Sequence, residues 1–189
     1  MSHFLFEIGF EEMPARFLPG LTEEVKTLFA EALVQAKVTC GPVAAFATPR
    51  RLVVSIPDIA ASARQEEEVV SGPPERVGYD AAGNPTPAAI GFAKGQGCAV
   101  ADVYVMETGK GRYLALRKNT GGQATLDLLP GICLEAVKKL SFPNRMRWGS
   151  REFAFGRPVH WFLALLDDVV VPFELDGIDS GRQTRGQRI

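Results

Sequence analysis

The stretch Phe4-Leu5-Phe6-Glu7-Ile8-Gly9-Phe10-Glu11-Glu12-Met13-Pro14 lies at the start of the chain and joins an apolar run to a cluster of acids. The apolar residues predict a β-strand that ends near the glycine. Glu7, Glu11 and Glu12 crowd the far end of this strand. Because like charges repel, acids placed this closely need solvent or a cationic partner. The segment is therefore either a solvated loop or one half of an ion-pair cluster.

The composition is that of an ordinary globular protein. The chain has 189 residues, 46% of them hydrophobic, and a net charge of -1, enough for one sizeable domain or two small ones. No stretch approaches the roughly 20 apolar residues that span a bilayer, and no secretory signal opens the chain, so we expect no membrane partner. Cys40, Cys98 and Cys133 are widely spaced and form no CxxC pair. This favours reduced thiols in a cytoplasmic protein over disulfides or a zinc site.

Hydrophobic periodicity predicts two main amphipathic helices and one short helix. The first helix has Thr22 as its N-cap, Glu23 and Glu24 in its first turn, and its last apolar residue at Ala36. The second covers residues 129–140, with Pro130 in its first turn or at a kink. The short helix begins at Thr86-Pro87 and ends by residue 95 or 97.

Strand-like segments surround these helices. After the first strand they cover residues 43–46, 52–56, 103–107, 113–118, 159–166 and 169–175. Most follow one another closely, so we expect an α+β fold with a largely antiparallel (mixed) sheet, in which strands pair mostly with their sequence neighbours. We treat residues 1–189 as one α+β unit. The less regular stretch 58–86, which includes an exposed acidic run at residues 66–68 and a rigid turn at residues 72–74, is the place for any sub-boundary.

The sequence lacks the common catalytic motifs. It contains no Walker loop, no GxGxxG before a helix, no HExxH and no nucleophile elbow, so we assign neither catalytic residues nor metal ligands. Gly109-Lys110-Gly111 fits a hairpin turn better than a phosphate loop. His160 lies in an apolar strand, where a structural role is the better interpretation.

Arginines dominate the basic residues of the last third of the chain. Arginine offers a planar fork that suits phosphates and carboxylates, and it stacks on bases. Contact with an RNA backbone is one interpretation, for which the candidate residues are Arg145, Arg147, Trp148, Arg182, Arg185 and Arg188. The other interpretation is that these arginines pair with Glu7, Glu11, Glu12 and the other acids. Separately, we expect a structural ion-pair cluster made of Glu7, Glu11, Glu12, Arg50, Arg51 and Arg157.

Six short motifs, taken in order, resemble one protein family. They are Glu7-Ile8-Gly9 with Glu11-Glu12 and Pro14, Thr48-Pro49-Arg50-Arg51-Leu52, Gly72-Pro73-Pro74, Met146-Arg147-Trp148-Gly149, Phe155 with Arg157-Pro158-Val159, and Thr184-Arg185-Gly186 with Arg188. Together they resemble the β subunit of the bacterial two-subunit-type glycyl-tRNA synthetase across essentially the whole chain. Phe10, Met13 and Gln187 depart from the family pattern, and Gln187 stands where a histidine is usual.

The resemblance implies an aminoacyl-tRNA synthetase, a heterotetramer of two α and two β chains that charges tRNA with glycine using ATP. It also implies that ATP and Mg²⁺ act at the α subunit, so that this chain holds no cofactor and is inactive alone. The expected partners are the α subunit, tRNA and a second β subunit. A family β chain is much longer, with an anticodon-binding module near its far end, so these residues are expected to form an N-terminal fragment.

Three functions remain open from the sequence. The chain either contributes tRNA or α-subunit contacts without catalysis, or is a scaffold with internal ion pairs, or is a hydrolytic or editing enzyme. The last would use Glu11, Glu12 and His160 and is the least favoured.

Overall fold

The computed structural model describes residues 1–80, 82–109, 111–149 and 152–186. It forms two compact units. The first comprises Met1–Arg64 and Gly122–Ile189, and the second is the inserted segment Gln65–Gly121. The sequence predicts a single unit with any sub-boundary within residues 58–86. The boundary after Arg64, where the chain passes from the first unit to the second, lies in that stretch. The boundary before Gly122, where the chain returns to the first unit, is not predicted from the sequence.

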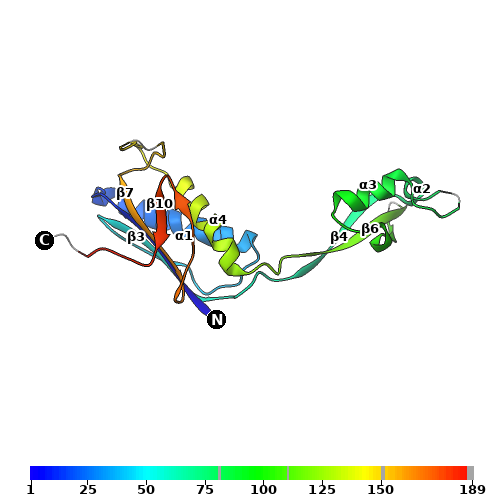
Figure 1. The fold of residues 1–189 in the computed structure, drawn as a ribbon, viewed down its shortest axis with the longest axis horizontal. Coiled ribbons are helices and arrows are strands. Elements are labelled where there is room, and N and C mark those ends of the chain that lie inside the picture. The colour runs from blue at the N-terminus through cyan, green and yellow to red at the C-terminus, as the bar shows by residue number, and fades with distance from the viewer. Residues whose placement is uncertain (81, 110, 150–151, 187–189) are drawn as a thin grey trace. The chain divides into compact units, whose positions relative to one another are not determined.

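The first unit is a mixed sheet with two long helices (Figure 1). Its strands are β1 (Ser2–Phe10), β2 (Ala44–Thr48), β3 (Arg51–Ile59), β7 (Val159–Leu166), β8 (Val169–Val170), β9 (Glu174–Leu175) and β10 (Ile178–Gly181). Its helices are the 3₁₀ turn η1 (Ala15–Phe17), α1 (Leu18–Gln35) and α4 (Thr125–Lys139).

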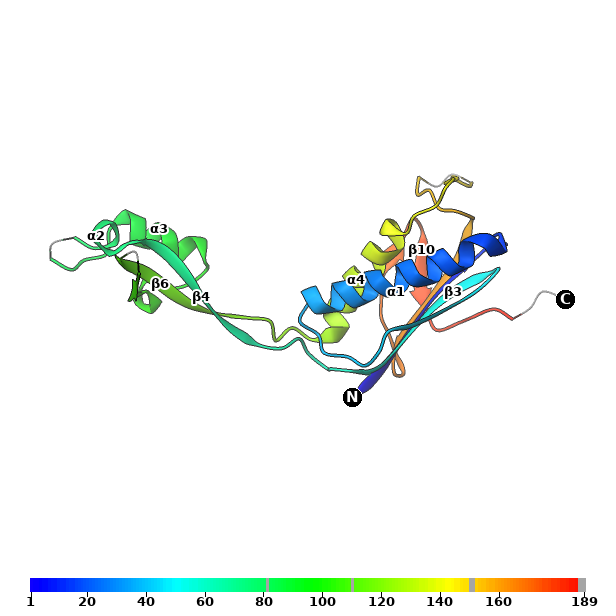
Figure 2. The same cartoon turned by 180° about the vertical axis from the view of Figure 1, so that it is seen from behind.

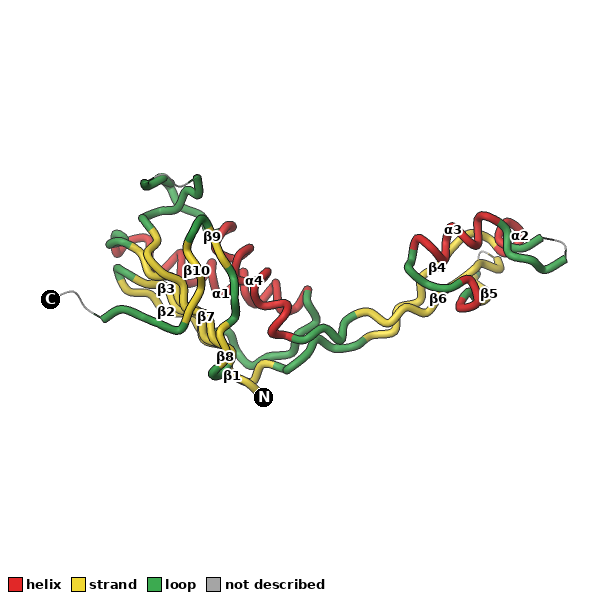
Figure 3. The backbone as a smooth tube through the Cα atoms, in the orientation of Figure 1, coloured by secondary structure: helices red, strands yellow, loops and turns green. Residues whose placement is uncertain are grey.

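Strand β1 is central in the sheet, whose order is β2-β3-β1-β7-β10-β9, with β8 also paired to β7 (Figure 3). All pairings are antiparallel except that of β10 with β7. The predicted α+β class and largely antiparallel sheet are therefore confirmed. The predicted pairing of sequence neighbours is right for β2–β3 and β7–β8 but wrong for β1, which pairs with β3 and with β7.

One face of β1 forms the centre of the core. Phe4, Phe6 and Ile8 alternate along the strand and are fully buried, because side chains two residues apart share a face. Helices α1 and α4 cover this face (Figure 2). Phe29 of α1 packs against the ring of Phe6, with 5.2 Å between the ring centroids.

The start of α1 differs from the prediction, and the first turn of α4 is excluded as the place of Pro130, which leaves the kink as the alternative for that residue. Helix α1 begins at Leu18, directly after η1 and with a proline in its first turn, so Thr22 is not the N-cap. The Thr22 hydroxyl instead donates to the carbonyl of Leu18 at 2.8 Å. Glu24 lies beyond the first turn and accepts a bond from the backbone N–H of Ser141 at 3.0 Å. In α4, which begins at Thr125, Pro130 lies inside the helix beyond the first turn.

The second unit is a three-stranded antiparallel sheet with the order β4-β6-β5. Its elements are β4 (Glu66–Pro74), α2 (Glu75–Gly78), α3 (Pro87–Gly95), η2 (Val100–Asp102), β5 (Tyr104–Thr108) and β6 (Gly111–Thr120). The predicted short helix and the β5–β6 hairpin are confirmed. The acidic run at residues 66–68 is exposed as expected, but it belongs to strand β4, which the sequence does not predict. The stretch 72–74, predicted as a rigid turn, also lies in β4.

Ala89 and Ala93 of α3 bury their methyl groups against Leu114 and Leu116 of β6, which gives the second unit a small core of its own. In the described part of the chain, no helix is both long and apolar enough to cross a membrane.

We predict that Phe29→Ala lowers the free energy of unfolding by about 3–5 kcal/mol, because it opens a cavity between α1 and β1. Val34→Ala is the control on the same helix, since Val34 is 75% exposed. Urea denaturation measures both variants. A loss for Phe29→Ala no larger than that for Val34→Ala would contradict this account of the core.

Candidate functional site

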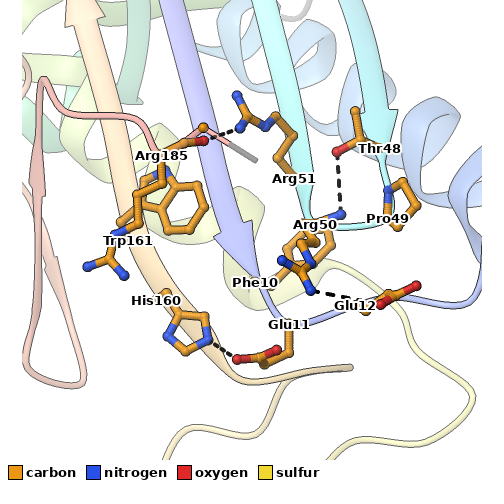
Figure 4. Close-up of a pocket in the computed structure, with 11 residues that line it drawn as sticks. Phe10, Glu11, Glu12, Thr48, Pro49, Arg50, Arg51, His160, Trp161 and Arg185 are labelled. Atoms are coloured by element: carbon orange, nitrogen blue, oxygen red, sulfur yellow. Dashed lines mark hydrogen bonds and ion pairs between the residues drawn. The ribbon is translucent and has the colours of Figure 1, made fainter. Parts of the chain in front are cut away.

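A cavity of about 640 Å³ lies where β1 ends, β2 turns into β3 and β7 begins (Figure 4). Residues from all four strands and from the C-terminal segment line it: Phe10, Glu11, Glu12, Thr48, Pro49, Arg50, Arg51, His160, Trp161, Arg185 and Gly186. It therefore brings the acidic start of the chain, the Thr48-Pro49-Arg50-Arg51 turn and the C-terminal motif into one place.

Cross-strand register explains why these segments meet. On the sheet face opposite the helices, Gly9 lies between Arg51 of β3 and Trp161 of β7. The missing side chain of Gly9 lets the indole of Trp161 lie over β1. A Cβ at position 9 would lie 2.0 Å from Cε2 of Trp161. Glycine is therefore required at position 9 by this close approach.

Glu7 is the buried acid of this face, with only 6% of its surface exposed. Its carboxylate accepts bonds from Trp161 Nε1 at 2.7 Å and from the Thr184 hydroxyl at 2.6 Å. Arg51 Nη1 lies 3.4 Å from the other carboxylate oxygen. Two neutral donors and one cation thus satisfy a charge that would be costly to bury alone.

The same contacts hold the C-terminal segment against the sheet. Arg51 also donates to the Thr184 hydroxyl at 3.2 Å and to the backbone carbonyl of Arg185. The guanidinium of Arg185 lies over the Trp161 ring, 5.5 Å from its centroid. The motif at residues 184–186 therefore forms one wall of the cavity.

A β-bulge turns His160 toward the cavity. Gly9 lies opposite Trp161, but the next residue, Phe10, lies opposite Val159, which leaves His160 as the extra residue of β7. In a regular strand, adjacent residues point to opposite faces, whereas here both His160 and Trp161 line the cavity. His160 Nε2 lies 2.6 Å from Glu11 Oε1.

The structure brings together part of the predicted ion-pair cluster. Arg51 pairs with Glu7 at 3.4 Å and Arg50 with Glu12 at 4.0 Å. Glu11 contacts His160. The Nε atom of Arg157 donates to the backbone carbonyl of Glu12 at 3.1 Å and not to a carboxylate.

The predicted RNA-contact residues lie in two separate segments. In the first, Arg145 donates to the carbonyl of Leu140, Arg147 Nε donates to the carbonyl of Glu152 at 3.1 Å, and Trp148 packs edge-on against Phe153. In the second segment, Arg182 donates to the carbonyl of Asp168 at 2.9 Å. Arg185 lies at the cavity, and Arg188 falls outside the described residues, as does Gln187.

The sequence assigns no role to Trp161 or Thr184. For His160 it favours a structural role, with the hydrolytic site as the least favoured alternative. A signal for Trp161 was present, because Gly9 interrupts a strand of large residues, and an isolated glycine in a strand marks a close approach. No local pattern predicts the Thr184 contact, which joins residues 177 positions apart.

Comparison with known proteins matches residues 4–189 to the family described as "Glycyl-tRNA synthetase beta subunit". The chain belongs to this family. It is 79% identical over 189 residues to the glycine–tRNA ligase beta subunit of Solidesulfovibrio magneticus and covers 27% of that protein. It is 52% identical to that of Nitratidesulfovibrio vulgaris and 42% identical to that of Syntrophus aciditrophicus. Thus the chain spans about a quarter of the length of these relatives, 27% in each case.

We predict that Glu7→Ala lowers the free energy of unfolding by about 2–4 kcal/mol, because it leaves Arg51 and the Trp161 N–H without their shared acceptor. Glu12→Ala is the matched control, since its 4.0 Å pair with Arg50 is exposed and is worth less than about 1 kcal/mol. Denaturant titrations compare the two. Equal effects would show that Glu7 does not anchor the site.

Proposed function

We propose that this chain is the N-terminal part of a glycine–tRNA ligase β subunit and supports ATP-dependent attachment of glycine to tRNA by contacting tRNA. Family membership supports the general role. The contact itself is proposed from the state of the arginines. The partners would be tRNA, the α subunit and a second β chain in a heterotetramer, in the cytoplasm.

Two sets of arginines in the first unit differ in their partners. Arg50 and Arg51 lie beside carboxylates. Arg145, Arg147 and Arg182 are exposed, and their described hydrogen bonds go to neutral backbone carbonyls. A carbonyl orients a guanidinium without cancelling its charge, so these three side chains keep a positive charge for phosphates.

Contacts of this kind position an RNA and do not read its sequence. The backbone carbonyls limit where each of the three guanidiniums points, which lowers the entropy lost when a phosphate binds. Arg145 and Arg147 lie in one segment of the first unit and Arg182 lies in another, so we propose two points of phosphate contact.

The chemistry of glycine activation is proposed to lie in the α subunit, with ATP and Mg²⁺. Gly109 and Gly111 flank the turn of the β5–β6 hairpin and do not precede a helix, so they do not fit an ATP phosphate loop.

A scaffold without RNA contact is the second candidate, and the Glu7 cluster favours it. That cluster joins β1, β3, β7 and the C-terminal segment through one carboxylate. The Glu11–His160 pair is the geometry on which the hydrolytic candidate would depend.

We predict that the triple variant Arg145→Gln, Arg147→Gln, Arg182→Gln binds tRNA more weakly than the parent chain at low salt. The slope of log affinity against log salt should fall in magnitude by about 2–3, because each lost phosphate contact removes one released counterion. Glycine and non-glycine tRNAs should lose affinity alike. Fluorescence anisotropy with labelled tRNA at several salt concentrations measures both quantities.

The matched control removes three cations that already have an acidic partner: Arg112→Gln, Arg117→Gln and Lys139→Gln. The net charge changes equally in the two triple variants. If both lose the same affinity and slope, the effect is one of overall charge and the specific contact is rejected. If neither changes, the scaffold function is favoured.

We also predict that this chain alone catalyses no glycine-dependent ATP–pyrophosphate exchange, because its sequence carries no Walker loop to hold the triphosphate of ATP. The exchange should appear when the α subunit is added. Exchange above background without the α subunit would overturn the division of labour between the subunits.

A further inference from the structure

We propose that the cavity at the end of β1 holds one unpaired nucleotide of RNA, with its base on the Trp161–Arg185 stack and its phosphate at Arg50 (Figure 4). This inference rests on the proposed tRNA contact and names a place where that contact is made. The cavity volume of about 640 Å³ lies within the usual range for small-ligand pockets, roughly 300–1,000 Å³.

The Trp161 ring of the stacking surface is held in place before any ligand arrives. The Trp161 ring lies on Gly9, its N–H is bonded to Glu7, and the Arg185 guanidinium lies over its face. Aromatic rings and guanidinium planes are the groups on which unpaired RNA bases stack. Because the ring does not have to be ordered on binding, more of the stacking energy appears as affinity.

Arg50 is the cation that is available to a phosphate. The one described contact of its guanidinium is with Glu12 at 4.0 Å, which is too long for a hydrogen bond. The neighbouring Arg51 is committed to Glu7 and Thr184. A phosphate beside Arg50 would accept short charge-assisted hydrogen bonds from its guanidinium, whereas the carboxylate of Glu12 is too far away to accept them.

The acids of the cavity favour a nucleotide over an acidic peptide. Glu11 and Glu12 both line the cavity, and carboxylates accept bonds from the N–H groups on the edge of a base. An acidic peptide carries several carboxylates and no base edge, so its acids would face Glu11 and Glu12 with nothing to donate to them. A ligand with an N–H-bearing edge and a single phosphate matches both charges of the site.

Quenching of Trp161 fluorescence tests the proposal directly. The chain has two tryptophans, so Trp148→Phe leaves Trp161 as the one reporter. AMP and GMP should quench it saturably. Arg185→Ala and Arg50→Ala, made in this background, should each weaken binding by about tenfold, the scale of losing one stacking or phosphate partner. Substituting Trp161 itself is avoided, because it would remove the reporter and expose Glu7.

Arg16→Ala is the matched control, because Arg16 also lies over an aromatic ring, that of Phe17 at 4.8 Å, but does not line the cavity. It should leave quenching unchanged. Circular dichroism and thermal melting confirm that each variant is folded. Equal losses for Arg16→Ala and Arg185→Ala would overturn the proposal.

Two further probes separate the alternatives. Ribose 5-phosphate and a short acidic peptide should each compete at least tenfold more weakly than AMP, since neither carries a base for the stack. Equal competition by the sugar phosphate would reduce the cavity to a phosphate site, and equal competition by the peptide would make it a protein contact. Either result overturns the nucleotide proposal.

Nucleotide quenching and tRNA anisotropy together separate the nucleotide cavity from the tRNA contact. If labelled tRNA binds the chain but AMP and GMP quench nothing, tRNA contact stands and the nucleotide cavity is rejected. If AMP and GMP quench Trp161 fluorescence, and if Arg185→Ala and Arg50→Ala weaken their binding, the nucleotide cavity is supported even where tRNA anisotropy shows no change.

Discussion

The buried carboxylate of Glu7 is the constraint on which the arrangement of the first unit depends. A charge inside a sheet is tolerated only when its lone pairs and its charge are both satisfied. Here an indole N–H, a hydroxyl and a guanidinium do this together. Each donor comes from a different segment, so a single acid fixes the position of β3, β7 and the C-terminal segment relative to β1.

That constraint also shapes the cavity. Trp161 can reach Glu7 because Gly9 leaves room for its ring, and the bulge beside it turns His160 to the same side. The two irregularities, a glycine in one strand and an extra residue in its partner, lie next to each other. Strand irregularities of this kind are common beside binding sites, where they re-aim a side chain. The site therefore arises from local departures from the regular sheet.

The sequence predicts the parts of this fold that depend on local pattern. The apolar run of β1, the helical spacing in α1 and the Thr86-Pro87 helix start are set by neighbouring residues, and the structure has the strand and both helices. The sequence misplaces the start of α1 because Thr22 resembles a cap, whereas the preceding 3₁₀ turn and proline begin the helix earlier. The sequence does not predict strand β4, because its acids and prolines are unfavourable for a strand. It is a strand because it pairs with β6.

Contacts between distant segments could not be predicted in the same way. The sequence indicates that Glu11 and Glu12 need a cation, and the structure brings Glu12 beside Arg50. It does not indicate that Glu7, the first acid of the cluster, is the buried one. That choice follows from the strand register and from the Trp161 and Thr184 contacts, which join the two ends of the chain.

The pairing of β1 with β7 has a consequence for synthesis on the ribosome. Strand β1 is made before the other strands of its sheet, but one of its two partners begins at Val159. Until that partner emerges, one edge of a very apolar strand stays open, which is a condition that favours aggregation and chaperone binding. The segment Gln65–Gly121 makes its contacts locally and can fold in the meantime. The inserted unit is therefore expected to fold before the unit whose sequence it interrupts.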